Sequence, residues 1–181
     1  MTINSVLDAR EIHIIHLRQD DPKKCTARAL QRRNLVTVHD KIAGPRIGIV
    51  LDPICGKVLG PEDINPKESP IIALDCSWKS IEVSIDALDR RANLRHRTLP
   101  LLLAASPVSW GKPGRLSTAE AMALCAAIMG RIEQAERILR PFRFGKEFLE
   151  LNAEPIREYQ ECKTNQEIVE KQWSFFDPPN D

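Results

Sequence analysis

The chain has 181 residues, with 26 Lys and Arg against 25 Asp and Glu, and a formal net charge of +1. This length suits one domain or two small ones, and the near-neutral charge excludes a polybasic protein that binds nucleic acid by bulk charge alone. We expect no membrane span and no secretory signal, because no apolar run is long enough and the first ten residues lack the signal pattern. The five cysteines are odd in number and lack paired spacing, so we expect reduced thiols in a cytoplasmic protein, without disulfides or a metal site.

Four short apolar runs predict β-strands over 11–17, 46–51, 70–74 and 99–105. Each is rich in Ile, Val or Leu, which is typical of strands buried on both faces. Between them, Asp21-Pro22 begins a helix that runs to about Arg33, and residues 79–91 have helical spacing. Because the connections are much longer than hairpin turns, we expect parallel strands joined by crossovers.

The pattern becomes helical after residue 108. Ser117 and Glu120 form an S-x-x-E capping box ahead of an Ala-rich helix over 121–129. Gly130 separates it from an amphipathic helix over 131–140, and a second capping box, T-x-x-E, precedes the last helix. We therefore expect an α/β parallel-sheet domain over 1–107 and an all-helical C-terminal domain over 108–181.

Ligands of an open parallel sheet bind at the carboxyl ends of its strands. The segments that follow the predicted strands are rich in Pro, Gly, Asp, Trp and Thr. The chain has no GxGxxG or GxxxxGK[ST] motif for phosphates, no GxSxG motif and no HExxH motif. These absences favour a nucleoside ligand without phosphates, and S-adenosylmethionine fits that description.

Several runs carry a resemblance to a known family: DPKKCTARAL, LDPICGKVLGPED, LDCSW, RTLPLLLAASPVSWGKPGRLSTAEA, EQAERIL and FRFGKEFLELN. Over about residues 11–160 the chain resembles the small-subunit rRNA aminocarboxypropyltransferases, in their short archaeal form. The resemblance implies an α/β fold with a parallel five-stranded sheet and a SPOUT-like deep trefoil knot, followed by an all-helical C-terminal part. The chain departs from the family pattern at SPVSW, where relatives often have NPVNY, and at Gly114, where a larger residue is common.

The resemblance also implies an activity. The 3-amino-3-carboxypropyl group of S-adenosylmethionine would move to N3 of a modified uridine of the pseudouridine type in small-subunit rRNA, during ribosome biogenesis. The implied partner is this rRNA or the pre-ribosomal small subunit, and we expect a monomer. Two alternatives stay open: a SPOUT-type rRNA methyltransferase, and a non-enzymatic rRNA-binding assembly factor.

By position, the resemblance assigns Asp75 as the catalytic carboxylate that accepts or steers the N3 proton. Thr26 would hold the amino-acid tail of the cofactor, and Trp78 would offer its π face to the sulfonium. Backbone groups of Leu74, Leu99 and Gly114 would hold the ribose and adenine. The cofactor-binding positions are Thr26, Leu51, Pro53, Leu74, Trp78, Leu99, Gly114, Leu116, Thr118 and Ala121.

Basic residues in the connections around the sheet are expected to bind the rRNA backbone. Residues 1–146 hold 23 basic and 16 acidic residues, a net charge of +7, whereas residues 147–181 hold 3 and 9, a net charge of −6. We therefore expect the acidic segment to lie away from the RNA. The RNA-binding positions are Lys23, Lys24, Arg28, Arg90, Arg91, Lys112 and Arg115.

Several of these residues also have a plainer interpretation. Asp75 can cap the helix that follows it, and Glu120 can serve only in its capping box. Trp78 can be an ordinary core residue. His13 and His16, on a predicted strand, are expected to pack or to lie at the surface.

Overall fold

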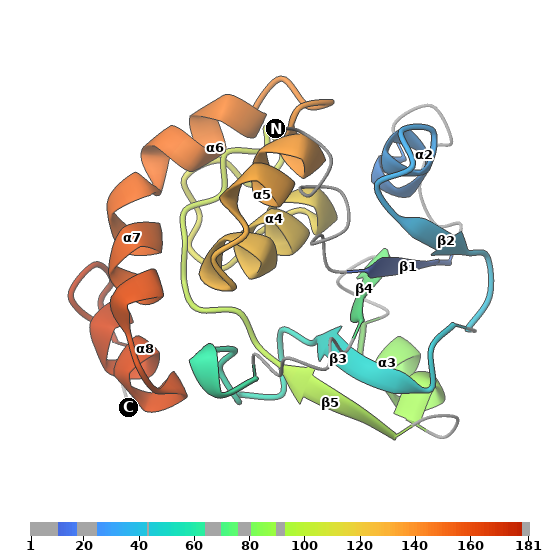
Figure 1. Cartoon of the computed structure of the whole chain (residues 1–181), viewed down its shortest axis with the longest axis horizontal. Helices are drawn as coiled ribbons and strands as arrows, with labels where there is room; N and C mark the ends of the chain where they lie inside the picture. The colour runs from blue at the N-terminus through green and yellow to red at the C-terminus, as the bar shows by residue number, and fades with distance from the viewer. Residues whose placement is uncertain are drawn as a thin grey trace, which may run out of the picture. The chain divides into compact units, whose positions relative to one another are not determined.

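The computed structural model describes residues 11–17, 25–42, 44–63, 70–75, 81–89 and 93–178, and Figure 1 shows the chain as a cartoon. The chain divides into two compact units: unit 1 comprises residues 1–52 and 66–96, and unit 2 comprises residues 53–65 and 97–181. In the described ranges, no helix has the length and apolar character needed to cross a membrane. The domain division predicted at residue 107 stays a prediction.

Unit 1 is built on one sheet of five strands in the order β2-β1-β4-β3-β5. The pairings of β1 with β2, of β1 with β4 and of β3 with β4 are parallel. The parallel five-stranded sheet is thus confirmed, whereas the knot and the all-helical C-terminal part stay predictions. The strands are β1 (Ile12–His16), β2 (Thr37–His39), β3 (Ile47–Leu51), β4 (Ile71–Asp75) and β5 (Asn93–Arg97).

Two helices cover opposite faces of this sheet. Ile85 and Leu88 of α3 belong to a buried apolar cluster that includes Ile15 of β1. Cys25, which directly precedes α2, contacts His16, the next residue of β1. Because successive strand residues point to opposite faces, the sheet lies between α2 (Thr26–Gln31) and α3 (Ile81–Asp89).

Unit 2 contains a central helix, α4, that is buried along almost its whole length. Ser117 Oγ accepts from Glu120 N at 3.3 Å, and Glu120 Oε2 accepts from Ser117 N at 2.7 Å, which confirms the predicted capping box. At the second predicted box, Thr164 Oγ1 accepts from Glu167 N at 3.1 Å. The elements are the 3₁₀ turn η1 (Pro61–Asp63) and the helices α4 (Thr118–Ile128), α5 (Ile132–Leu139), α6 (Gly145–Leu151), α7 (Ala153–Glu161) and α8 (Asn165–Gln172).

The apolar run over 99–105 is not a strand, so this prediction was wrong. Leu103 N donates to Asn152 Oδ1, and Asn152 Nδ2 donates to Leu103 O, both at 2.9 Å. The hydroxyl of Tyr159 donates to Leu101 O, also at 2.9 Å. Side chains of the C-terminal helices therefore satisfy the backbone groups that a neighbouring strand would otherwise pair. A buried apolar run looks the same in sequence in both cases.

Two strands, β2 and β5, contain no apolar run from which the sequence could predict them. Both lie at the ends of the strand order, where a strand has one neighbour and can carry polar side chains. His96 in β5 bonds to Asp52 at 2.8 Å and to Asp89 at 2.6 Å. Polar pairing of this kind replaces the apolar packing that identifies the inner strands.

We expect the stability of the protein to fall in mild acid because of a stacked histidine pair on β1 and β2. His13 Nδ1 and His39 Nε2 lie 2.9 Å apart. Burial, and then the neighbouring His13, hold the pKa of His39 below its usual 6.5. As the pH falls through this range, the unfolded chain takes up a proton that the folded chain resists, so stability is lost.

Calorimetric Tm values between about pH 7.5 and about pH 5.5 test this prediction. The wild type should lose Tm toward the lower pH, and His39→Gln should lose less. The same pH dependence in both proteins would contradict it.

Candidate active site

Two strands that are distant in the chain meet at the middle of the sheet. β1 and β4 lie side by side, although the chain passes through β2 and β3 between them. Their last residues, His16 and Asp75, are register partners. Open α/β sheets bind ligands at such a change in strand order, beyond the carboxyl ends of the strands. The fold therefore places the expected site of unit 1 beside His16 and Asp75.

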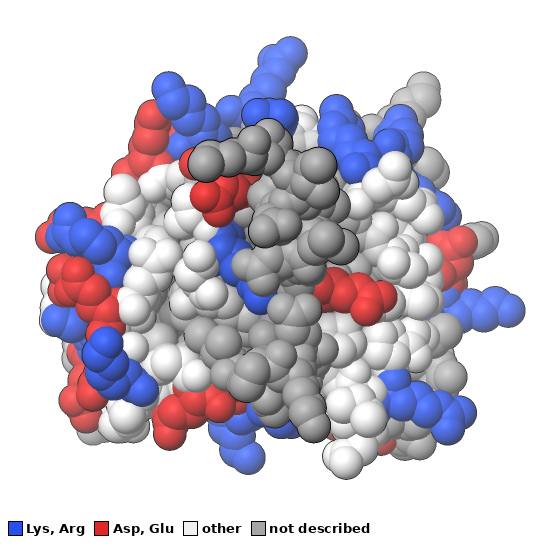
Figure 2. Space-filling view, in the orientation of Figure 1, with Lys and Arg blue, Asp and Glu red and all other residues white. Residues whose placement is uncertain are grey.

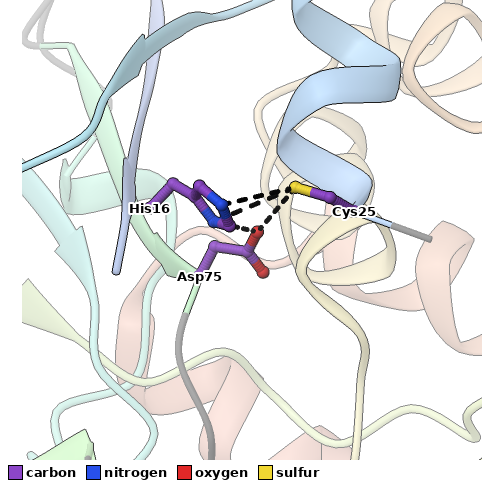
Figure 3. A group of neighbouring side chains, drawn as sticks. All are labelled: His16, Cys25 and Asp75. Atoms are coloured by element: carbon purple, nitrogen blue, oxygen red, sulfur yellow. Dashed lines mark hydrogen bonds and ion pairs between the residues drawn. The ribbon is translucent and has the colours of Figure 1, made fainter. Parts of the chain in front are cut away.

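Three buried polar side chains meet at this edge (Figure 3). His16 Nδ1 lies 3.2 Å from Asp75 Oδ2. Cys25 Sγ lies 3.9 Å from the same oxygen and 3.7 Å from His16 Nε2. The exposed fractions of His16, Cys25 and Asp75 are 5%, 3% and 7%. Because water is largely excluded, these interactions are stronger than they would be at the surface.

The cluster has the donor atoms of a metal site and also the contacts of a hydrogen-bond network. One ligand atom from each residue lies within 4.8 Å of the others, and His, Cys and Asp are common zinc ligands. The imidazole Nδ1–H and the thiol can equally donate to the carboxylate without an ion. With both protons used in this way, Cys25 Sγ only packs against His16 Nε2. In this network they fix the orientation of the Asp75 carboxylate. The expectation of no metal stays a prediction.

The predicted cofactor positions of unit 1 lie at or near the same edge. Leu51 ends β3, and Leu74 precedes Asp75 in β4; both side chains are buried. Thr26 begins α2, next to Cys25, and is half-buried. Trp78 lies outside the described residues. The apolar side chains and the polar cluster thus occur at neighbouring positions in unit 1.

The backbone of β4 explains how Leu74 can offer its carbonyl. Ile49 N donates to Pro70 O at 2.9 Å, so every second carbonyl after Pro70, including that of Leu74, faces β3. The register of this pair ends at Val50 and Ile72. The donors on β3 also recur every second residue after Ile49, so the donor opposite the Leu74 carbonyl would be residue 53. Residue 53 is proline and has no N–H. The hydrogen-bond ladder between β3 and β4 therefore leaves the Leu74 carbonyl without a donor from β3.

The predicted cofactor positions of unit 2 lie in the turn after β3, in the loop over 99–117 and at the start of α4. Gly114 N donates to Leu102 O at 3.0 Å, and its φ of +67° lies in the left-handed region that favours glycine. A Cβ on Gly114 would approach Leu101 Cδ2 to 3.1 Å, so the backbone here is closely packed. Pro53 is exposed, and the half-buried positions are Leu99, Gly114, Leu116, Thr118 and Ala121.

Glu120 does more than close its capping box. Its side chain is fully buried, and Oε1 accepts from Ala105 N at 2.7 Å and from Ser106 N at 2.9 Å. Together with the bond from Ser117 N, one carboxylate holds three backbone donors. Glu120 therefore fixes the loop after residue 104 to the first turn of α4. Sequence reasoning found only the capping half of this role.

The predicted RNA-binding positions fall into three groups. Arg28 donates to Asp40 at 2.7 Å and to Gln31 at 3.0 Å, so its charge is already paired. Lys112 and Arg115 are exposed on the loop over 106–117. Figure 2 shows Lys and Arg side chains projecting in the region of α6. The positions outside the described residues are Lys23, Lys24, Arg90 and Arg91.

Acidic side chains line a surface groove of about 500 Å³ formed by α7 and α8. Lys171 lies 3.2 Å from Glu158 and holds the pKa of that carboxyl below its usual range. Burial raises the pKa of the Cys162 thiol in the same groove. The other carboxylates, which repel phosphates, come from Glu161, Glu167 and Glu170.

Sequence reasoning missed two members of the buried cluster. His16 was expected only to pack or to lie at the surface, and Cys25 was not assigned a role. The sequence signal that could have found them is their position. His16 lies near the end of the first predicted strand, and Cys25 directly precedes Thr26, and ligand sites are common at strand ends and helix starts. Only the pairing of β1 with β4 brings them to Asp75.

Comparison with known proteins shows the family. Residues 49–176 match the family described as "Ribosome biogenesis protein, C-terminal". A protein named 16S rRNA aminocarboxypropyltransferase from Methanosarcina acetivorans is 47% identical over 162 residues, which cover 89% of this chain and 91% of the relative. A protein of the same name from Halobacterium salinarum is 40% identical, over 94% and 99% of the two chains.

A solved structure is similar over nearly the whole chain. It is described as the SAM-dependent rRNA:acp-transferase Tsr3 from Vulcanisaeta distributa, with 33% identity and a TM-score of 0.78, over 92% of this chain and 88% of that one. The chain therefore belongs to the 16S rRNA aminocarboxypropyltransferase family, whose C-terminal region carries the ribosome biogenesis description.

One further match concerns the N-terminal part. Residues 10–41 match a model described as "Possible Fer4-like domain in RNase L inhibitor, RLI". An iron–sulfur cluster of this kind needs four thiolates, whereas this stretch contains one cysteine, Cys25. The match therefore gives no support for a cluster within residues 10–41.

Proposed function

We propose that this protein transfers the 3-amino-3-carboxypropyl group of S-adenosylmethionine to N3 of a modified uridine, of the pseudouridine type, in small-subunit rRNA. The relatives named above support the reaction and its RNA class. The structural observation that carries the proposal is the buried carboxylate of Asp75 at the carboxyl edge of the sheet, held by His16. We further propose a monomer that acts in the cytoplasm and has the SPOUT-like knot and the helical domain over 108–181.

The chemistry of the cofactor positions fits S-adenosylmethionine. When bound, this cosubstrate supplies a positive sulfonium whose three attached carbons are open to attack. Buried Leu51 and Leu74 offer apolar surface, and the Leu74 carbonyl offers a hydrogen-bond acceptor. Gly114 has no Cβ, so a planar base can approach its backbone closely. We propose that Thr26 binds the amino-acid tail, and that Trp78 and the unit 2 positions complete the binding.

In this proposal Asp75 accepts the N3 proton of the target base. When N3 forms its bond to the carbon of the transferred group, the carbon–sulfur bond breaks and methylthioadenosine leaves. The N3 proton must then be accepted, and Asp75 is the carboxylate that we propose for this step. His16 and Cys25 hold Asp75 Oδ2, so the group is oriented before substrate arrives.

Transfer from differently labelled cofactors tests the reaction. We expect label in the carboxyl carbon of S-adenosylmethionine to enter small-subunit rRNA, and label in the methyl carbon to stay out of it. Entry of the methyl label alone would identify a methyltransferase instead. If neither label enters the RNA and calorimetry detects no cofactor binding, the protein is an assembly factor without this activity.

A further inference from the structure

One tryptophan of unit 2 is exposed on a loop that is otherwise closely held. Trp110 is 60% exposed, and its neighbour Val108 is 90% exposed. Scattered apolar residues at a surface need no explanation. A tryptophan that keeps most of its surface in water on a fixed loop is different, because the loop cannot fold back to cover it.

Backbone hydrogen bonds fix this loop from both sides. Gly111 N donates to Ala104 O at 2.7 Å, and Ala104 N donates to Lys112 O at 3.2 Å. Lys112 N also donates to Ser109 O at 3.0 Å. Glu120 holds the start of the loop, as described above. The segment that carries Trp110 therefore has its conformation before any partner binds.

The indole of Trp110 is held by its edge. Nε1 donates to Glu147 Oε1, in the first turn of α6, at 3.0 Å. This bond uses the only polar atom of the indole and restricts the orientation of the ring. The exposed area must then lie largely on the apolar ring, which is the part that stacks on a nucleobase.

The charges around the ring suit a polyanion. Over residues 99–117 the chain has two basic residues, Lys112 and Arg115, and no Asp or Glu. Lys112 is exposed two residues after Trp110, and Arg143 is exposed four residues before Glu147. Neither cation forms an ion pair with another residue in the described part of the chain. The opposing charges on α6 are Glu147, which accepts from the indole, and Glu150, which lies 3.3 Å from Lys146.

We propose that Trp110 is a stacking surface for an unpaired base of the rRNA substrate, with neighbouring cations holding the phosphates. This inference rests on the proposed function, because it takes RNA as the substrate. Bases offer their faces to an aromatic ring only when they are unpaired, so the partner is single-stranded or looped RNA. A rigid, edge-held ring loses little entropy on binding, which favours this use over a merely flexible surface contact.

Binding of a fluorescein-labelled single-stranded oligouridylate by the full-length protein tests the proposal. Trp110→Ala should raise Kd roughly 5- to 100-fold, because a stacked base is lost. Trp110→Phe keeps a ring without the N–H and should raise Kd by less than about 3-fold. The matched control is Trp173→Ala, which removes another exposed tryptophan, at the end of α8, and should leave Kd unchanged.

Salt separates stacking from charge. The effect of Trp110→Ala should persist at high salt, whereas that of Lys112→Ala should shrink as phosphate contacts are screened. A duplex of the same length should show no Trp110 effect. Equal losses in Trp110→Phe and Trp110→Ala would assign the effect to the Glu147 bond and overturn stacking. A Trp110 effect on anionic lipid vesicles alone would also overturn it.

The same variants distinguish this inference from the proposed function. If Trp110→Ala binds and modifies small-subunit rRNA like the wild type, stacking is wrong while the reaction stands. If the wild type transfers neither label but binds oligouridylate through Trp110, the proposed reaction fails and the RNA surface stands. Tm measurements on each variant should show an unchanged fold, since Trp110 is mostly exposed.

Discussion

Asp75→Asn is expected to slow transfer of the aminocarboxypropyl group by about 10²- to 10⁴-fold, the usual contribution of a positioned proton acceptor. Asparagine keeps the size of the side chain and can still bond to His16, but it cannot accept a proton at neutral pH. Cofactor affinity should change by less than about 3-fold. Single-turnover transfer to rRNA and calorimetric titration with S-adenosylmethionine measure the two effects separately.

Asp52→Asn is the matched control for this experiment. Asp52 is also buried and bonds to a histidine, His96, at 2.8 Å. It therefore reports what the loss of a buried Asp–His pair in the same unit does to the fold. We expect its transfer rate to stay within about 10-fold of the wild type. If both variants lose activity equally and in step with Tm, Asp75 acts through the fold and has no chemical role.

Glu120→Ala is expected to destabilise the protein by about 3–5 kcal/mol. Its carboxylate accepts from three backbone N–H groups, those of Ala105, Ser106 and Ser117. Each donor left buried without a partner costs about 1–3 kcal/mol, and these costs are not fully additive. In a chain of this size the loss lowers Tm by roughly 10 °C, which calorimetry measures directly.

The second capping site provides the comparison. Glu167 lies three residues after Thr164, as Glu120 does after Ser117, but Glu167 is exposed. We expect Glu167→Ala to cost about 1 kcal/mol or less. Glu120→Gln should fall between the two, because its amide can accept at one atom but presents a donor at the other. Similar losses for Glu120→Ala and Glu167→Ala would show that Glu120 only caps its helix.

Predictions from local sequence succeeded where the fold follows local rules. Three of the four predicted apolar runs coincide with strands β1, β3 and β4 to within one residue at each end, and both predicted capping residues, Ser117 and Thr164, cap a helix. The prediction failed for 99–105, because its backbone partners are side chains such as Asn152 and Tyr159. It also missed the edge strands β2 and β5, which lack apolar patterning. The family resemblance supplied the number of strands, which the apolar runs alone did not.

The candidate site was also predictable only in part, because some of its residues meet only through contacts between distant segments. Asp75 could be singled out because it directly follows the predicted apolar run over 70–74 and because it matches the family pattern. His16 could not, since its importance comes from the register between β1 and β4, whose residues are far apart in the chain. Trp110 stood out in sequence as a departure from the family pattern, but its exposure and its bond to Glu147 are properties of the folded loop.

The sequence by itself therefore determined the inner strands, the helix starts and the edge of the sheet at which the candidate site lies. These depend on residue spacing and on neighbours within a few positions, which determine periodicity and capping. Only the tertiary structure decided that His16, Cys25 and Asp75 form one buried cluster, that Glu120 ties a loop to α4, and that 99–105 is not a strand. Each of those outcomes needs contacts between distant segments, and strand order and helix packing create such contacts only in the folded chain.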